Sequence, residues 1–212
     1  MTAAAPALLQ HTKREHFPPL LTPNGLAFPR GRAAEIFGAA SSGRTTLLVN
    51  TLAQATGPER ELCALVDTHD TFDPHSAAAA GVVLHRLLWI RCGGNIDRAL
   101  RSADLLLQAN GFGFVALDLA SASPHATQRI PPAAWYRLRN AVENTRTILA
   151  VIGATPLAKQ CAMVSVEAKR RTAEWSGMAD CSRLLDGADL RFEHRKPFGA
   201  PAASLAAMAA RA

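Results

Sequence analysis

One stretch of the chain decides its fold: Gly38-Ala39-Ala40-Ser41-Ser42-Gly43-Arg44-Thr45. Its glycines and final hydroxyl have the spacing of a phosphate loop, and only Arg44 departs from that pattern, because it stands where lysine is usual. An apolar run, residues 33–37, precedes the stretch, and residues 45–55 have the apolar spacing of a helix. The sequence therefore predicts a strand, a phosphate-binding loop and a helix in that order.

Such a loop binds anions because its backbone N–H groups point into a concavity at a helix N-terminus. Arginine keeps the charge of lysine in a longer, planar side chain, so we expect phosphate binding to be retained and hydrolysis to be weak. The competing interpretation is a tight strand-to-helix turn without a ligand. The predicted nucleotide-binding residues lie in the loop and the first helical turn: Gly38, Ser41, Ser42, Gly43, Arg44, Thr45 and Thr46.

Two residues are candidates for holding Mg²⁺, if a nucleotide binds. The Thr45 hydroxyl has the position of the magnesium ligand in a phosphate loop. Asp118 follows an apolar run, residues 114–117, so its carboxylate would sit beside the loop on the magnesium side. The alternative for Asp118 is a strand-end residue that caps the next turn.

Apolar runs alternate with helical patterns along the rest of the chain. This alternation predicts an α/β fold with three layers, in which helices cover both faces of a mostly parallel sheet. Two late runs, residues 162–168 and 190–194, predict a small antiparallel C-terminal addition. The other predicted strands are residues 62–66, 87–91, 114–117 and 147–152, and the other predicted helices are 74–80, 95–110 and 131–143.

Composition indicates one soluble core domain. With 212 residues and 49% apolar content, the chain can bury one sizeable core, which we place at residues 21–198. Residues 1–20 and 199–212 are expected to be tails, the second with helical propensity over 204–211. No signal peptide is recognisable, and no run approaches the roughly 18 to 20 apolar residues that cross a bilayer.

The cysteines and the charge say less about function. Cys63, Cys92, Cys161 and Cys181 lack close spacing, so we expect reduced core residues in a cytoplasmic protein rather than a zinc site. A net charge of +6 is compatible with nucleic acid without requiring it. The basic residues 169–171 and 194–196 form either a phosphate-binding patch or a solvated edge.

Ordered segments of the chain resemble the ATP-binding core of RecA. They include Glu35-Ile36-Phe37-Gly38, Ser41-Ser42-Gly43-Arg44-Thr45-Thr46-Leu47, Leu65-Val66-Asp67 and Asp73-Pro74, with Asp118 matching the magnesium-side aspartate. The resemblance covers roughly residues 24–195. It implies a RecA-like core with ATP and Mg²⁺ as cofactors.

The departures from RecA argue against an efficient recombinase. His69 stands where RecA has its catalytic glutamate, and Asp70, displaced by one residue, is a candidate to replace that carboxylate. The glutamine that senses nucleotide in RecA has no counterpart after Ile152, and the two DNA-binding loops, residues 121–130 and 154–161, are short. The long polymerisation helix and the C-terminal domain of RecA are also missing from this sequence.

Among RecA-like proteins with these departures, the chain is most similar to the ImuA family. The run Leu87-Leu88-Trp89-Ile90-Arg91-Cys92 and the run Trp135-Tyr136-Arg137-Leu138-Arg139 carry this resemblance. It implies a non-recombinase scaffold of bacterial damage-induced translesion synthesis that is cytoplasmic and nucleoid-associated. The implied partners are an ImuB-like inactive Y-family polymerase homologue and an error-prone replicative-type polymerase, with weak or indirect DNA contact and no membrane.

Two other functions remain open. One is a divergent DNA-dependent ATPase of the RecA class, in which Arg44 contacts phosphate and Asp70 or Glu35 assists the attacking water. The other is an SOS-linked inhibitor of cell division that needs no nucleotide. ATP turnover separates the first from a scaffold, and partner binding with a blocked phosphate loop separates the second.

Overall fold

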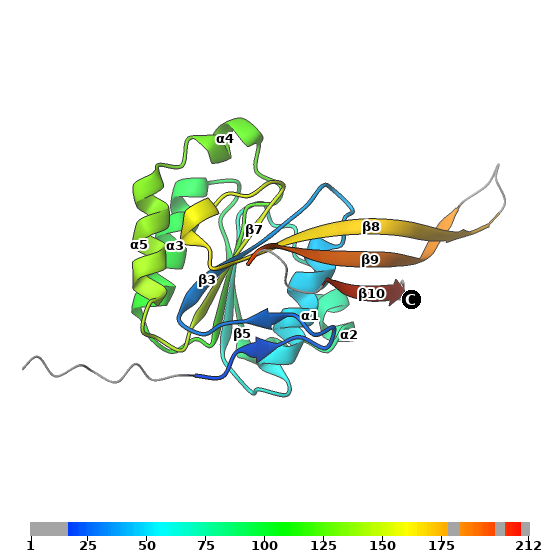
Figure 1. The fold of residues 1–212 in the computed structure, drawn as a ribbon, viewed down its shortest axis with the longest axis horizontal. Coiled ribbons are helices and arrows are strands. Elements are labelled where there is room, and N and C mark those ends of the chain that lie inside the picture. The colour runs from blue at the N-terminus through cyan, green and yellow to red at the C-terminus, as the bar shows by residue number, and fades with distance from the viewer. Residues whose placement is uncertain (1–16, 178–182, 198–201, 209–212) are drawn as a thin grey trace, which may run out of the picture.

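The computed structural model describes residues 17–177, 183–197 and 202–208. Helices cover both faces of a central sheet: α3 (Ile96–Gln108) and α5 (Pro132–Val142) on one face, α1 (Arg44–Thr56) and α2 (Pro74–Ala79) on the other (Figure 1). The eight strands lie in the order β10 (Ala203–Met208), β9 (Leu184–Lys196), β8 (Val164–Ser176), β3 (Arg32–Phe37), β7 (Ile148–Gly153), β6 (Phe114–Asp118), β4 (Cys63–Asp67) and β5 (Leu87–Arg91).

Most neighbouring strands of this sheet are parallel. The run from β8 through β3, β7, β6 and β4 to β5 is parallel throughout, whereas β8, β9 and β10 pair antiparallel. The predicted three-layer α/β fold with an antiparallel C-terminal addition is confirmed. Because β3 lies in the middle of the sheet, the loop that follows it emerges where the carboxyl ends of several parallel strands meet.

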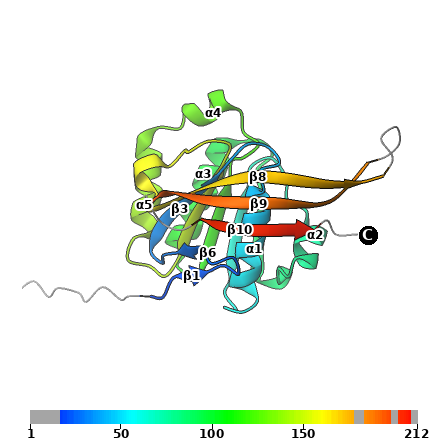
Figure 2. The same ribbon diagram turned by 45° about the vertical axis from the view of Figure 1, so that its right-hand side comes forward.

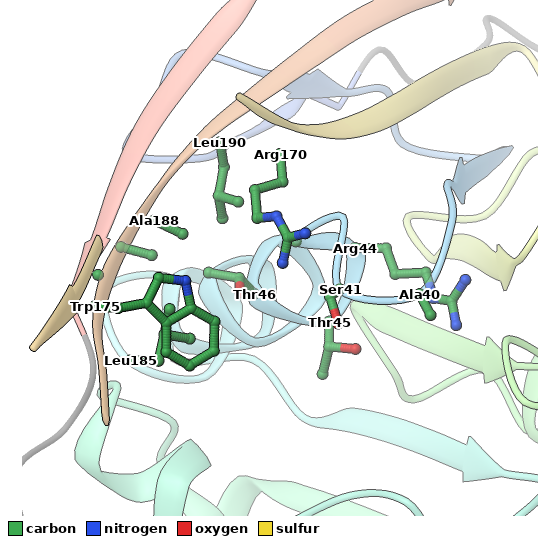
Figure 3. A pocket seen from close by; sticks show the side chains of 13 residues that line it. Ala40, Ser41, Arg44, Thr45, Thr46, Arg170, Trp175, Leu185, Ala188 and Leu190 are labelled. Carbon is green, nitrogen blue, oxygen red and sulfur yellow. The ribbon is translucent and has the colours of Figure 1, made fainter. Parts of the chain in front are cut away.

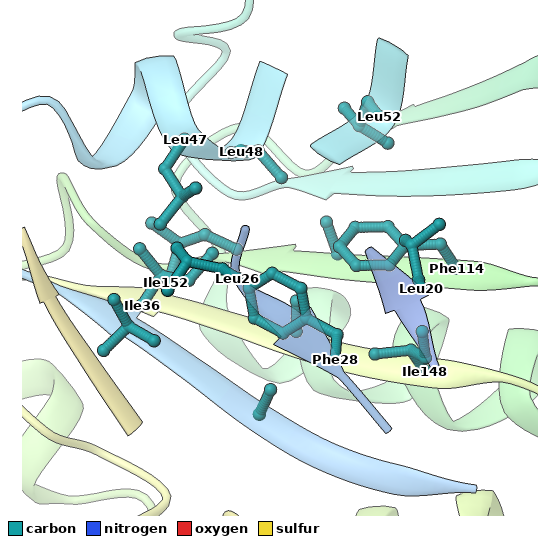
Figure 4. Packing of buried hydrophobic residues seen from close by; sticks show 14 of the residues in the cluster. Leu20, Leu26, Phe28, Ile36, Leu47, Leu48, Leu52, Phe114, Ile148 and Ile152 are labelled. Atoms are coloured by element: carbon teal, nitrogen blue, oxygen red, sulfur yellow. The ribbon is translucent and has the colours of Figure 1, made fainter. Parts of the chain in front are cut away.

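Alternation along the central strands divides the core into two halves. On β7, Ile148, Ala150 and Ile152 face α1, while Leu149 and Val151 face α3 and α5. Figure 4 shows the α1 side, where Leu47, Leu48 and Leu52 of the helix meet the sheet. A strand buried on both faces reads as a continuous apolar run, which is why these strands were predictable.

A two-stranded sheet that the sequence did not predict closes the α1 side of the core. It pairs β1 (Leu20–Leu21) with β2 (Ala27–Phe28), and Leu20 and Phe28 are fully buried. Leu20 is also the last residue of the expected N-terminal tail, whose residues 1–16 lie outside the described parts of the chain. Two-residue strands carry no periodicity, so a pattern search does not detect them.

The antiparallel addition is longer than predicted. Strands β8 and β9 each have 13 residues, and they run with β10 past helix α1 (Figure 2). Strand β10 falls within the residues expected to be a helical tail, and residues 203–208 instead pair with β9. The cross-strand pairing with β9 overrides the helical propensity of this Ala-rich segment.

The connecting segments contain three short helices. The segment predicted to be the first DNA-binding loop contains α4 (Pro124–Gln128), which Ser123 caps by accepting a hydrogen bond from Ala126 N. Two 3₁₀ turns, η1 (Leu84–Arg86) and η2 (Lys159–Cys161), complete the description. In the described parts of the chain, no helix is both long and apolar enough to cross a bilayer.

Three of the four cysteines are buried free thiols, as predicted: Cys63, Cys92 and Cys161. Burial raises the pKa of the Cys63 thiol to about 12, so this side chain is chemically inert at neutral pH. Cys181 lies outside the described residues.

Candidate phosphate-binding site

The phosphate loop, residues 38–45, connects strand β3 to helix α1 and depends on two glycines. Gly43 has a φ of +93°, and a Cβ there would lie 2.6 Å from the Cδ1 of Leu190 on β9. A Cβ at Gly38 would lie 2.5 Å from the carbonyl oxygen of Ala168 on β8. Any side chain at either position would therefore displace the loop from the β8–β9 hairpin.

The start of helix α1 leaves backbone donors without acceptors inside the helix. Its first hydrogen bond runs from Leu47 N to Gly43 O, at 2.9 Å, and the first turn contains no acidic residue. The N–H groups of Arg44, Thr45 and Thr46 therefore lack intrahelical partners, and the positive end of the helix dipole is not neutralised. This arrangement favours an anion at the loop.

Ser42 adds an orphaned polar atom to the same loop. Its side chain is 5% exposed, and its Oγ has no hydrogen-bond partner. A buried hydroxyl without a partner is unfavourable, so the loop is not fully satisfied by its own residues. Together with the two glycine contacts and the free N–H groups, this feature makes the loop suited to a phosphate group.

Arg44 does not point freely into solvent. Its guanidinium donates one hydrogen bond to the carbonyl oxygen of Gly38 and another, of 3.2 Å, to that of Ala120. These bonds satisfy a cation at the N-terminus of a helix, where the dipole disfavours positive charge. Arg44 consequently ties the loop to the segment after β6.

Asp118 is the last residue of strand β6, as predicted, and it interacts electrostatically with Arg44. Its Oδ1 accepts a hydrogen bond of 2.8 Å from Ala120 N. Burial is the main cause that raises the pKa of its carboxyl, and the negative charge of neighbouring Asp67 adds to the rise. Thr45 lies in the first turn of α1, on the cavity described below.

Asp67, at the end of β4, is already saturated with donors. It accepts from the backbone N–H groups of His69, Thr71 and Phe72, and from the indole Nε1 of Trp89 at 3.2 Å. This carboxylate therefore organises the turn after β4 rather than facing a ligand.

The residues around the catalytic position of RecA are arranged differently. The Nδ1 of His69 is buried without a hydrogen-bond partner. Asp70, the candidate carboxylate, forms an ion pair of 3.0 Å with Arg91 on the edge strand β5. Neither residue lines the cavity at the phosphate loop.

Glu35, the alternative helper for water, is 3% exposed and holds the loop after β7 in place. It accepts hydrogen bonds from Leu157 N, Ala158 N and the Ser165 hydroxyl, at 3.1, 3.0 and 2.7 Å. All these donors belong to the protein itself, so Glu35 is a structural carboxylate in this fold.

The loop opens on a cavity of about 480 Å³ between helix α1 and the antiparallel strands, which we call the hairpin cavity. Figure 3 shows Arg170 and Trp175 of β8 facing the loop across this space. Residues 169–171 were a candidate phosphate-binding patch in the sequence, and of these three Arg170 lines the cavity, but its position at the phosphate loop was not predicted. The lining residues are Ala40, Ser41, Gly43, Arg44, Thr45, Thr46, Arg170, Trp175, Leu185, Gly187, Ala188, Leu190 and Ala207.

A second cavity, of about 650 Å³, lies on the other side of the first turn of α1. It shares Thr45 and Thr46 with the hairpin cavity and extends to Phe72 and Asp73, at the start of α2. Space for a ligand larger than a phosphate is therefore available on both sides of the loop.

The model of the RecA N-terminal domain family matches residues 23–128, which is half of the chain. The chain belongs to this family. The matched residues include the phosphate loop, the turn after β4 and Asp118, whereas the β8–β9 hairpin lies beyond them. The RecA resemblance read from the sequence is confirmed at this level.

Proteins named RecA are similar to this RecA-family chain over a limited length. That of Chloroflexus aurantiacus is 30% identical over 138 residues, 58% of this chain and 39% of the relative. That of Bacteroides thetaiotaomicron is 31% identical over 134 residues, 57% and 40% of the two chains. That of Borrelia duttonii is 36% identical over 102 residues, 47% and 27%. The chain thus spans about two fifths or less of the length of these relatives.

Proposed function

We propose that this RecA-family chain binds a nucleoside triphosphate with Mg²⁺ without hydrolysing it efficiently, and that it serves as an ImuA-like accessory protein of damage-induced translesion synthesis. The observation that carries the proposal is the contrast between the loop and its surroundings. The loop keeps the glycines, free N–H groups and hydroxyls that hold phosphate. The guanidinium of Arg44 and the carboxylate of Asp70 are engaged with other parts of the protein.

The phosphates would lie against the backbone of residues 38–46. Mg²⁺, when bound, neutralises part of the phosphate charge. Thr45 and Asp118 are the residues that would hold it, and the raised pKa of Asp118 fits a carboxyl that is kept from solvent until a cation compensates it. ATP and Mg²⁺ are thus the proposed cofactors.

Weak hydrolysis follows from the groups that would have to activate water. A carboxylate that orients the attacking water must have an acceptor oxygen free for it. Asp67 and Glu35 accept hydrogen bonds from several protein donors each, and Asp70 pairs with Arg91. Position 69, two residues after Asp67, carries a histidine, which does not reproduce the charge of a glutamate.

The accessory role rests on the resemblance to the ImuA family, and the placement of two segments supports it. Strand β5, which carries the first of the similar runs, is an edge strand with Leu88 46% exposed. Helix α5, which carries the second, has Tyr136 45% exposed. Both segments therefore present apolar or aromatic side chains to a partner such as an ImuB-like polymerase homologue, with an error-prone replicative-type polymerase in the same complex.

The test combines a turnover assay with a partner-capture assay. We expect the full chain to bind ATP, to show no stimulation of hydrolysis by single-stranded DNA, and to co-purify with the ImuB-like protein from damaged cells. Vigorous DNA-stimulated hydrolysis would instead support the divergent-ATPase alternative and reject the proposal.

Thr45→Glu is the matched variant for the role of nucleotide. Thr45 is exposed in the first turn of α1, where an acidic residue is favourable to the helix, so the variant should fold normally. Its carboxylate would occupy the place of a phosphate and repel one. If partner capture does not require the nucleotide, Thr45→Glu will capture the partner as well as the wild type, which would favour a nucleotide-independent inhibitor.

A further inference from the structure

The β8–β9 hairpin separates its charged residues onto two faces. On the outer face, Glu167 and Glu193 pair with Lys169 and Arg195, with N–O distances of 2.9 Å for Lys169–Glu193 and 3.3 Å for Arg195–Glu193. Arg191 joins this network through Glu193, at 3.1 Å. The basic residues of this face are therefore compensated by acidic neighbours within the hairpin.

Arg170 faces the opposite way. Side chains alternate between the two faces along a strand, so Arg170 lies on the face opposite to Lys169, and its cross-strand partner is Leu190. Arg171 lies at a register shift of β8 and does not line the hairpin cavity. Among the described residues, Arg170 has no hydrogen-bond or ion-pair partner, whereas Arg171 lies 3.9 Å from Asp189. Figure 3 shows the Arg170 guanidinium directed toward the first turn of α1.

The position of Arg170 is fixed by the packing on either side of it. Leu190 is 3% exposed and packs directly against Gly43 of the loop. Ala168, two residues before Arg170 on the same face of β8, is 2% exposed and presents its carbonyl oxygen to Gly38. The β8–β9 hairpin that carries Arg170 is thus packed against both glycines of the phosphate loop, Gly38 through β8 and Gly43 through β9.

The charged side chains that line the hairpin cavity are all basic. Arg44 and Arg170 both line it, and none of the described lining residues is acidic. Arg44 already donates to the carbonyl oxygens of Gly38 and Ala120, so Arg170 is the cation whose donors remain available. A planar, forked guanidinium that has no partner among the described residues can bind two oxygens of a tetrahedral phosphate group, beside free N–H groups at a helix N-terminus.

We propose that Arg170 is a phosphate-contacting residue of the loop, supplied by β8 of the same chain, and that it takes over the charge contact that lysine makes in an ordinary phosphate loop. Its ligand is the polyphosphate of a nucleoside di- or triphosphate. This inference rests on the proposed nucleotide binding. It also implies that the β8–β9 hairpin, which the family model does not cover, is part of the nucleotide site.

The experiment measures the equilibrium affinity of the full chain for ATP, ADP and adenosine by titration calorimetry. The variants are Arg170→Ala and, as a matched control, Arg171→Ala, which removes the neighbouring arginine that lies near Asp189 and does not line the cavity. A charge-assisted hydrogen bond contributes enough that Arg170→Ala should weaken ATP and ADP binding about tenfold or more. Adenosine binding should not change, and Arg171→Ala should stay within about twofold of wild type.

Arg170 is solvent-exposed, so its replacement should not unfold the chain, and a thermal melt of each variant checks this directly. Arg170→Lys restores the charge without the fork and should recover part of the affinity for ATP. Recovery by a conservative variant distinguishes a contact with phosphate from a general loosening of the hairpin.

The outcomes separate this inference from the function on which it rests. If wild type binds ATP and Arg170→Ala binds it equally well, the role of Arg170 is rejected while nucleotide binding stands. If wild type binds no nucleotide, both are rejected. If Arg170→Ala loses affinity for a single-stranded oligonucleotide but not for ATP, the guanidinium contacts a nucleic-acid backbone, and the assignment is likewise overturned.

Discussion

Arg44 donates a hydrogen bond of 3.2 Å to the carbonyl oxygen of Ala120 and a second bond to that of Gly38. The two carbonyl groups lie at the ends of different strands, so one guanidinium joins the phosphate loop to the segment after β6. A forked side chain can make both bonds at once, which a single ammonium does less well. Arginine at this position therefore links the phosphate loop to the segment after β6, whereas a lysine would leave a more mobile cation in the loop.

Arg44→Lys should remove one of the two hydrogen bonds that link the loop to the segment after β6, and it should leave a more mobile cation in the loop. We expect the free energy of unfolding to fall by about 1 kcal/mol, the contribution of one hydrogen bond, and the affinity for ATP to rise. Urea denaturation and calorimetric titration measure the two effects. Arg91→Lys, which alters an exposed ion pair, is the control and should change neither. An Arg44→Lys variant with unaltered stability and unaltered affinity for ATP would show that the two Arg44 hydrogen bonds do not constrain the loop.

Asp118→Asn should change the dependence of stability on pH. Burial raises the pKa of this carboxyl in the folded chain, so the folded state binds its proton more tightly than the unfolded state. Its contribution to stability is therefore most favourable below the unfolded pKa of about 3.9 and is lost as the pH rises through the folded pKa. Asparagine carries no such loss and still offers an oxygen to Ala120 N.

The expected result is that Asp118→Asn is at least as stable as wild type at neutral pH, and that the difference narrows as the pH falls toward about 4. Thermal melts at a series of pH values measure it. A difference that grows on acidification would show that folding lowers the pKa of Asp118.

Glu35→Ala tests whether this carboxylate is structural. The variant leaves Leu157 N, Ala158 N and the Ser165 hydroxyl without their acceptor, so the free energy of unfolding should fall by about 3 kcal/mol. Glu35→Gln keeps one acceptor oxygen, so its free energy of unfolding should lie between those of wild type and Glu35→Ala. Urea midpoints measure the series, and an unchanged midpoint for Glu35→Ala would mean that these hydrogen bonds contribute nothing to stability.

The parts of the fold that the sequence predicted share one property: their signal is local. Strand β3, the loop and helix α1 follow one another within a short window, and the apolar runs of the buried strands are continuous. Strand β8 continues past Ala168 through charged residues whose partners are on β9. Its length therefore depends on pairs of residues that are far apart in the sequence, which a local pattern does not show. For the same reason the sequence indicated Arg170 only as one of three adjacent basic residues, because the register opposite Leu190 is what places it at the loop.

Leu190→Ala should destabilise the chain and also weaken nucleotide binding. Leu190 is 3% exposed and forms the wall against Gly43, so its truncation should lower the free energy of unfolding by about 2 to 5 kcal/mol. Leu184→Ala on the same strand, at a side chain that is 66% exposed, is the control and should change it by less than about 0.5 kcal/mol. Equal ATP affinity in a folded Leu190→Ala variant would show that the hairpin does not support the loop.

In the proposed function, the phosphate loop of this RecA-family chain holds a nucleotide that the protein does not hydrolyse efficiently. A single-turnover assay tests it most directly, with the full chain in excess over radiolabelled ATP and with Mg²⁺ and single-stranded DNA present. We predict that the label co-elutes with the protein as intact ATP and that Thr45→Glu retains none. Rapid, DNA-stimulated conversion of the bound ATP to ADP by wild type but not by Thr45→Glu would contradict the proposed function.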